Sequence, residues 1–197
     1  GLYGLEHHSV TETPLANARM LLEVLPPNAR VHLVTYSRGG LVGEALARAA
    51  REGGGPAFDR ADFALLDGKG YTVHRKELEA LNALIAARRP RIERIVRVAS
   101  PARGTLLASG RFDAYLGVLL WGLEKAGLPV RPELTDFAAE VARERADPAV
   151  FPGLEAMIPG RPVTQVLTRP DVRLASELRI VAGDIEGDSV LSWLKVL

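Results

Sequence analysis

The sequence predicts an α/β fold in which a mostly parallel sheet carries helices on both faces. Short hydrophobic segments typical of strands alternate with segments of amphipathic helical pattern, which is the order that parallel sheets require. Turns containing glycine or proline separate most of these segments. With 47% apolar and 25% charged residues among 197, the chain can bury a sizeable core, and we expect a single domain over residues 1–197.

Each predicted element follows from its local pattern. Thr13 and Pro14 predict the start of a first helix, because threonine accepts bonds from first-turn amides and proline fits the first helical position. Further helices are predicted over residues 41–52 and 76–88, and strands over residues 30–35, 63–66, 92–99 and 178–182. Two helices within residues 111–145 and a Pro/Gly-rich stretch over residues 151–170 indicate a helical insertion at about residues 111–160.

The composition excludes several classes of function. Lysine and arginine number 25 against 24 aspartates and glutamates, so the net charge of +1 supplies no field for nucleic acid, and no such partner is expected. Because cysteine is absent, disulfide frameworks, thiol nucleophiles and thiolate zinc sites are excluded. The longest uncharged run, residues 114–123, is far shorter than the about 20 residues that cross a bilayer. We expect a cytoplasmic protein without a metal or organic cofactor.

The sharpest local signal is Ser37, which stands where a hydrophobic strand turns abruptly into a helix (residues 34–42, VTYSRGGLV). In a nucleophile elbow the serine projects into a cleft, and the amide of the next residue, here Arg38, donates to the oxyanion that forms on attack. Strand and helix pass closely, so the positions two before and two after the serine must be small. Gly39 meets this requirement, whereas Thr35 stands where the G-x-S-x-G pattern has glycine.

Two other interpretations of this turn remain open. Serine is favoured at helix N-caps, so Ser37 could serve only as a cap followed by a glycine packing contact. A glycine turn between strand and helix is also typical of phosphate-binding loops. Neither G-x-G-x-x-G nor the lysine of a P-loop is present, which disfavours that reading.

Three segments together resemble a known family. Residues 37–42 (SRGGLV), 98–105 (VASPARGT) and 152–160 (PGLEAMIPG) are similar in type, order and spacing to segments of bacterial lipase-like α/β-hydrolases, the serine esterase and lipase superfamily. The resemblance extends over about residues 13–182 and is strongest to a poorly characterised branch that is sometimes fused to caspase-like protease modules. It implies an α/β-hydrolase fold and hydrolysis of an acyl-ester or lipid substrate through an acyl-enzyme on Ser37.

The resemblance also assigns roles to the later segments. Residues 100–105 would border the cleft, although Pro101 and Gly104 are equally typical of simple loop punctuation. Residues 111–145 would form a lid, whose apolar stretch at residues 115–123 could shield an acyl chain or make transient contact with a membrane surface. A buried core helix explains that stretch as well.

The rest of a triad is incomplete in this sequence. In α/β-hydrolases the chain order is serine, then Asp or Glu, then His. The last predicted strand ends in Gly183-Asp184, so Asp184 is the candidate acid, with Glu186 and Asp188 as neighbours. A solvated turn, a weak cation site, or an acid beyond Leu197 are the alternatives.

None of the four histidines follows the last predicted strand. His32 lies within a strand and is interpreted as structural, His7 and His8 lie in an early loop, and His74 is expected to be solvated at the start of an exposed helix. The loop that supplies the second oxyanion donor in this fold is also missing. We therefore expect a chain truncated at both ends, possessing a nucleophile whose histidine is supplied elsewhere.

Two functions from different classes follow. One is a serine ester hydrolase, with Ser37 and Asp184 catalytic and the Arg38 amide in the oxyanion hole; thioesterase or peptidase activity is a near alternative. The other is a catalytically inactive hydrolase-like module that serves interaction or regulation in a larger multidomain protein. Thr35 and the missing histidine favour the second, and the elbow favours the first.

Overall fold

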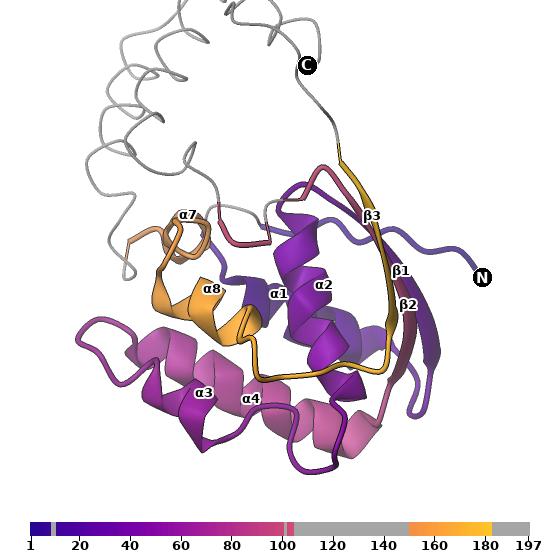
Figure 1. Ribbon diagram of the computed structural model, residues 1–197, viewed down its shortest axis with the longest axis horizontal. Helices are drawn as coiled ribbons and strands as arrows, with labels where there is room; N and C mark the ends of the chain where they lie inside the picture. The colour runs from indigo at the N-terminus through magenta and orange to yellow at the C-terminus, as the bar shows by residue number, and fades with distance from the viewer. Residues whose placement is uncertain (9–10, 101, 105–149, 183–197) are drawn as a thin grey trace, which may run out of the picture.

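The computed structural model describes residues 1–8, 11–100, 102–104 and 150–182 (Figure 1). Its centre is a parallel sheet of three strands in the order β1 (Arg30–Tyr36), β2 (Arg91–Val98) and β3 (Glu177–Val181). Across the sheet Leu33 pairs with Ile95, which pairs with Leu178. These strands confirm the predictions for residues 30–35, 92–99 and 178–182, and they make the α/β class with a parallel sheet a property of the structure.

The helices before β2 also follow the sequence closely. In α1 (Pro14–Val24) the predicted cap is present, because the hydroxyl of Thr13 accepts from the amide of Ala16 at 2.9 Å. Helix α2 (Gly39–Ala47) stops short of the predicted residue 52 and continues as a 3₁₀ turn, η1 (Arg48–Ala50). Helix α4 (Thr72–Arg88) begins four residues before its predicted start at residue 76.

The predicted strand over residues 63–66 is wrong. That segment falls in and after a short helix, α3 (Arg60–Ala64), which begins with a reciprocal capping box. The carboxylate of Asp59 accepts from the amides of Ala61 and Asp62, and the carboxylate of Asp62 accepts from the amide of Asp59 at 2.8 Å. Two carboxylates at this spacing satisfy the free first-turn amides, so the local capping outweighs the hydrophobic run.

The Pro/Gly-rich stretch over residues 151–170 is more ordered than its composition suggests. It contains α7 (Pro152–Glu155) and α8 (Pro162–Leu167), and each starts with proline at the first helical position. Of the predicted insertion at about residues 111–160, the structure describes residues 150–160, which contain α7. Its remaining part, residues 111–149, lies outside the described residues.

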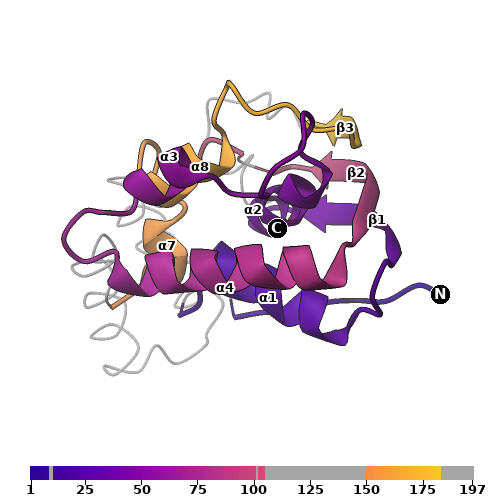
Figure 2. The same cartoon turned by 90° about the horizontal axis from the view of Figure 1, so that it is seen from below.

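All the helices that the structure describes lie on one face of the sheet (Figure 2). The strand order runs in one direction, and right-handed crossovers in one direction place their connections on the same face. The predicted covering of both faces is thus observed on one face within the described residues. On the other face Val34 and Tyr36 are 77% and 71% exposed.

The core lies between the sheet and the helices. Helix α2 packs on β1 and β2, and α1 and α4 pack against each other beside it. The fully or almost fully buried side chains that fill this layer are Leu15, Leu22, Leu41, Leu46, Leu78, Leu81, Ile92 and Ile95.

A buried charge network ties α3 and α8 to the end of α2. The guanidinium of Arg48 donates to the carboxylate of Asp62 and, at 3.1 Å, to the carbonyl of Val166. The side chains of Arg48 and Asp62 are 2% and 0% exposed. Arg169 adds a second cation, with a nitrogen 3.1 Å from Asp62 and 2.6 Å from Asp59.

Removing the charge of Asp62 is expected to weaken the fold strongly. Asp62→Asn leaves the buried Arg48 without its carboxylate, and breaking a buried pair costs about 3–5 kcal/mol. Urea denaturation measures the change in the free energy of unfolding. Asp67→Asn is the matched control, because the Asp67–Arg75 pair is solvent-exposed and worth about 0–1 kcal/mol. Equal losses in the two variants would contradict the buried role of Asp62.

Candidate functional site

Ser37 occupies a strained turn between β1 and α2. Its φ is 49°, in the left-handed region, where a residue other than glycine costs about 1–2 kcal/mol. The turn is held by main-chain bonds: the amide of Ser37 donates to Val98 at 3.1 Å, and the amide of Gly40 donates to Ser37 at 3.1 Å. Such strain persists only where the surroundings fix the backbone, and it is concentrated at functional sites.

The interpretation of Ser37 as a helix N-cap is wrong. Arg38 occupies the cap position of α2 in helical conformation, and no side chain caps the helix. Within the described part of the chain the hydroxyl of Ser37 has no hydrogen-bond partner. The serine therefore lies at the strand-to-helix turn with its hydroxyl unused.

The first amides of α2 are also unused. Among the described residues, neither the amide of Arg38 nor that of Gly39 has an acceptor. Free first-turn amides carry the partial positive charge of a helix N-terminus and bind anions readily. An oxyanion formed at the neighbouring Ser37 Oγ is an anion of the kind these donors stabilise.

Glycines explain how Thr35 fits where the motif has glycine. A Cβ built on Gly43 would lie 2.9 Å from the methyl carbon of Thr35, and one on Gly39 would lie 4.0 Å from Thr35 Cβ. The methyl therefore occupies space that Gly43 leaves open, one turn further along α2. The hydroxyl of Thr35 donates to the carbonyl of Val96 at 3.3 Å.

The neighbouring strand ends in a similar way. Ala99, directly after β2, has a φ of 45°, and Ser100 follows it. A Cβ on Gly40 would lie 1.5 Å from Ser100 Oγ and 2.6 Å from Ser100 Cβ, so α2 and the end of β2 touch with no room for a side chain. The hydroxyl oxygen of Ser100 is buried without a hydrogen-bond partner.

The segment after β2 in turn lies against the turn that follows α7. Gly104 has a φ of 86°, and a Cβ there would lie 2.6 Å from the carbonyl oxygen of Met157 and 2.7 Å from the nitrogen of Pro159. Close packing therefore requires glycine at position 104, which is more than a residue that ends a strand. Pro101 lies outside the described residues. From the other side the Nε of Arg38 donates to the carbonyl of Gly153 at 3.4 Å.

Three segments far apart in sequence thus meet at one edge of the sheet. Helix α2 touches Ser100, after β2, through Gly40, and the segment after β2 touches the turn after α7 through Gly104. Arg38 joins α7 to the turn at Ser37. These are the same three segments on which the expected resemblance to lipase-like hydrolases rests. Periodicity and composition gave no sign of contact between them.

None of the chain's histidines is bonded to Ser37. His32 lies on the exposed face of β1, 3.0 Å from Glu93, in keeping with its structural interpretation. His8 is exposed. His7 accepts from the Nη1 of Arg38 at 3.3 Å, and burial and the nearby Arg38 charge lower its pKa.

The expectation that His74 is solvated is wrong. Its side chain is 0% exposed, with Nε2 3.6 Å from the carboxylate of Glu155, which is also fully buried. Glu155 accepts from the hydroxyl of Tyr71. The sequence misplaced His74 because α4 begins earlier than predicted and α7 covers its first turn. Burial lowers the pKa of His74 to about 4 and raises that of Glu155.

The candidate acid Asp184, with Glu186 and Asp188, lies outside the described residues. The strand that leads to it is nevertheless β3, whose carboxyl end lies on the same edge of the parallel sheet as Ser37. In the described part of the chain no cluster of three or more His, Cys, Asp or Glu is arranged to hold a metal ion. Nor does any described helix reach the length and apolarity needed to span a bilayer.

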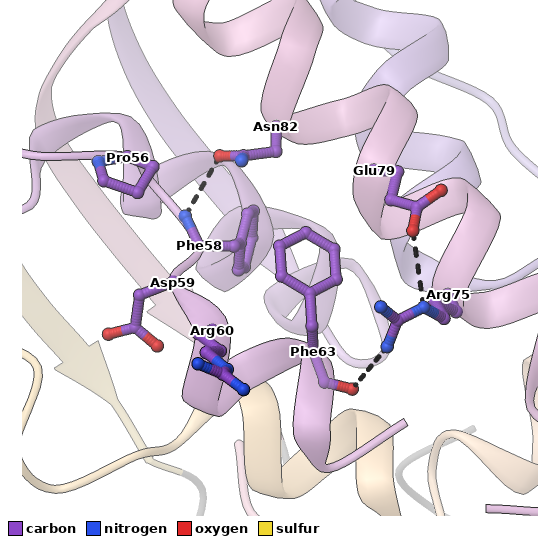
Figure 3. A pocket seen from close by; sticks show the side chains of 8 residues that line it. All are labelled: Pro56, Phe58, Asp59, Arg60, Phe63, Arg75, Glu79 and Asn82. Carbon is purple, nitrogen blue, oxygen red and sulfur yellow. Dashed lines mark hydrogen bonds and ion pairs between the residues drawn. The ribbon is translucent and has the colours of Figure 1, made fainter. Parts of the chain in front are cut away.

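The structure also has an open surface pocket apart from this edge (Figure 3). It lies between α4 and the segment around α3, and the rings of Phe58 and Phe63 face it. Arg75 stacks over the Phe63 ring at 5.4 Å from its centroid and contacts Glu79 at 3.3 Å. No residue near Ser37 lines it, so the pocket is not part of the candidate site.

Known proteins give limited guidance. Residues 2–60 match a family model described as a domain of unknown function, DUF7379. The matched part contains α1, β1 and α2, and so the turn at Ser37. No curated protein and no solved structure matches the chain. The chemistry of the site therefore rests on its own geometry.

A side chain at position 40 is expected to disrupt this edge. Gly40→Ala drives a methyl into Ser100, and overpacking of this kind costs about 1–3 kcal/mol in the free energy of unfolding. Gly39→Ala is the control, since its methyl would find only Thr35 Cβ at 4.0 Å. Urea denaturation compares the two. Ser100→Gly should restore stability in the Gly40→Ala background, and a failure to do so would contradict the contact.

The buried His74 predicts a pH dependence of stability. Its pKa falls from 6.5 to about 4 on folding, so between these values the unfolded chain binds the extra proton. Stability is therefore fully present above 6.5 and falls as the pH drops, by about 1.4 kcal/mol per unit. Urea denaturation at about pH 7.5 and about pH 5 should show a steeper loss in the natural protein than in His74→Gln. Glu155 is common to both proteins, so equal slopes would contradict the assignment.

Proposed function

We propose that this chain carries the nucleophile of a serine acyl hydrolase of the lipase-like α/β-hydrolase type, acting on carboxylic esters. The observation that carries the proposal is the left-handed backbone of Ser37, combined with a hydroxyl that caps nothing. The unused amides of Arg38 and Gly39 directly beside it support an oxyanion site. The contact between the three lipase-like segments supports the family assignment.

The reaction follows from these groups. Ser37 Oγ attacks the ester carbonyl carbon while a general base takes the hydroxyl proton, and the carbonyl oxygen becomes an oxyanion held by the Arg38 amide. The bond to the alcohol then breaks, the alcohol leaves with the proton from the base, and an acyl-enzyme remains. Water hydrolyses that ester and restores Ser37. Removing one oxyanion donor typically slows turnover about 100- to 1000-fold.

The base is the part that these residues do not supply. All four histidines lie in the described ranges, and none forms a hydrogen bond with Ser37; the contacts of His7, His32 and His74 include Arg38, Glu93 and Glu155 respectively. The proposal therefore requires a histidine from outside residues 1–197, with Asp184 or a later carboxylate orienting it.

The second candidate function is a hydrolase-like module without catalysis, acting in interaction or regulation. The absence of a hydrogen bond between Ser37 and any of the four histidines, all of which lie in the described ranges, favours it. It does not explain why a serine should hold a left-handed backbone beside two unused amides, which is why we place the hydrolase first.

A fluorophosphonate probe separates the two functions. In the natural full-length protein the Ser37 oxygen should displace fluoride from the probe and become covalently labelled, as mass spectrometry of the peptide would show. Ser37→Ala should abolish labelling and ester hydrolysis together. Ser176→Ala is the control, because that serine lies at the amino end of β3, where its hydroxyl bonds Ile92. A folded, full-length protein that stays unlabelled would establish the inactive module.

A further inference from the structure

The side chain of Arg38 is buried directly beneath the turn that holds Ser37. It is 5% exposed, although arginine normally keeps its guanidinium in water. Each of its nitrogens is used: Nε donates to the carbonyl of Gly153 at 3.4 Å, Nη1 contacts His7 Nδ1 at 3.3 Å, and Nη2 donates to the carbonyl of Glu12. One side chain therefore connects the turn, the N-terminal segment and α7.

The acceptors of Arg38 set it apart from the other buried arginines that the structure describes, Arg48 and Arg97, which both pair with carboxylates. Arg48 is paired with the carboxylate of Asp62, whereas Arg38 forms no ion pair in the described part of the chain and bonds two main-chain carbonyls and an imidazole. Burial lowers the pKa of Arg38 to about 10, so it stays charged at neutral pH. Arg38 is thus a buried cation one residue after Ser37, held by hydrogen bonds of fixed direction, with the charge of Glu12 nearby.

These contacts of the Arg38 guanidinium fix the backbone of Arg38 itself. The amide of Arg38 is the oxyanion donor of the proposed function, and a guanidinium held at three points fixes the residue that carries it. Arginine suits this role because its planar fork presents several donors in fixed directions, which a lysine ammonium cannot do. Ser37 depends on the same support, because its left-handed backbone must be held by its surroundings.

We propose that the guanidinium of Arg38 is the positioning group of this site: it holds the Arg38 amide and Ser37 in attacking geometry by tying the turn to His7, to Glu12 and to α7. The inference rests on the proposed function and deepens it. It also makes the site depend on α7 and the turn after it: Arg38 contacts Gly153 and Tyr71 contacts Glu155 in the helix, and Gly104 contacts Met157 in the turn.

The test compares two buried arginines in the natural full-length protein. Arg38→Met keeps the length of the stem and removes the donors, and Arg48→Met does the same at the far end of α2. The measurement is the rate of fluorophosphonate labelling of folded protein, alongside urea denaturation. We expect Arg38→Met to label about 100-fold or more slowly, as for the loss of an oxyanion donor, and Arg48→Met to label at the natural rate despite lower stability.

Further readouts separate positioning from general weakening. In ester hydrolysis Arg38→Met should lower kcat and leave KM nearly unchanged, because the guanidinium does not touch the substrate. Arg38→Lys, which keeps the charge without the fork, should also label more slowly, and it carries the test if Arg38→Met does not fold. Labelling of either Arg38 variant at the natural rate, or an equal slowing in Arg48→Met, overturns the inference alone. A natural protein that is not labelled overturns the proposed function and this inference with it.

Discussion

Close contacts at two glycines, which leave no room for a side chain, are the constraint on which the carboxyl edge of the sheet depends. Gly40 lets α2 touch the side chain of Ser100 after β2, and Gly104 lets the following segment touch the main chain of Met157 and Pro159, in the turn after α7. Contacts of this kind leave little freedom, because neither partner can move without a clash or a void. The strained backbone of Ser37 is held in this frame, and the unused hydroxyl and amides acquire fixed positions as a result.

Sequence reasoning succeeded where local signals decide the structure. The cap at Thr13, the strand before Ser37 and the strand after residue 91 follow from short patterns, and all three are present. It failed at residues 63–66, where two aspartates cap a helix that the hydrophobic run conceals. It also failed at His74, whose burial depends on α7, a helix that comes far later in the chain. Asp184 and most of the expected insertion fall outside the residues that the structure describes.

The candidate site shows the same division. The position of Ser37 and the importance of the glycines after it could be predicted, because a strand-to-helix turn leaves a readable signature. The sequence could not predict whether the serine caps the helix or leaves its hydroxyl free. The same residues fit both alternatives, and the backbone conformation of Ser37 and the cap position distinguish them. Nor could the sequence predict the path of the Arg38 side chain, which contacts three distant main-chain and side-chain acceptors without any sequence periodicity.

The pairing of Thr35 with Gly43 changes which sequence pattern identifies a turn of this kind. Strand and helix leave space for a single methyl group between these two positions, and here the strand supplies it. The G-x-S-x-G pattern requires glycine two positions before the serine, where this chain has Thr35, and a search with that pattern would miss it. A string with serine followed by glycines at the second, third and sixth positions describes the same spacing from the helix side. Related sequences should then fall into two groups, carrying the methyl on the strand or on the helix, and never on both.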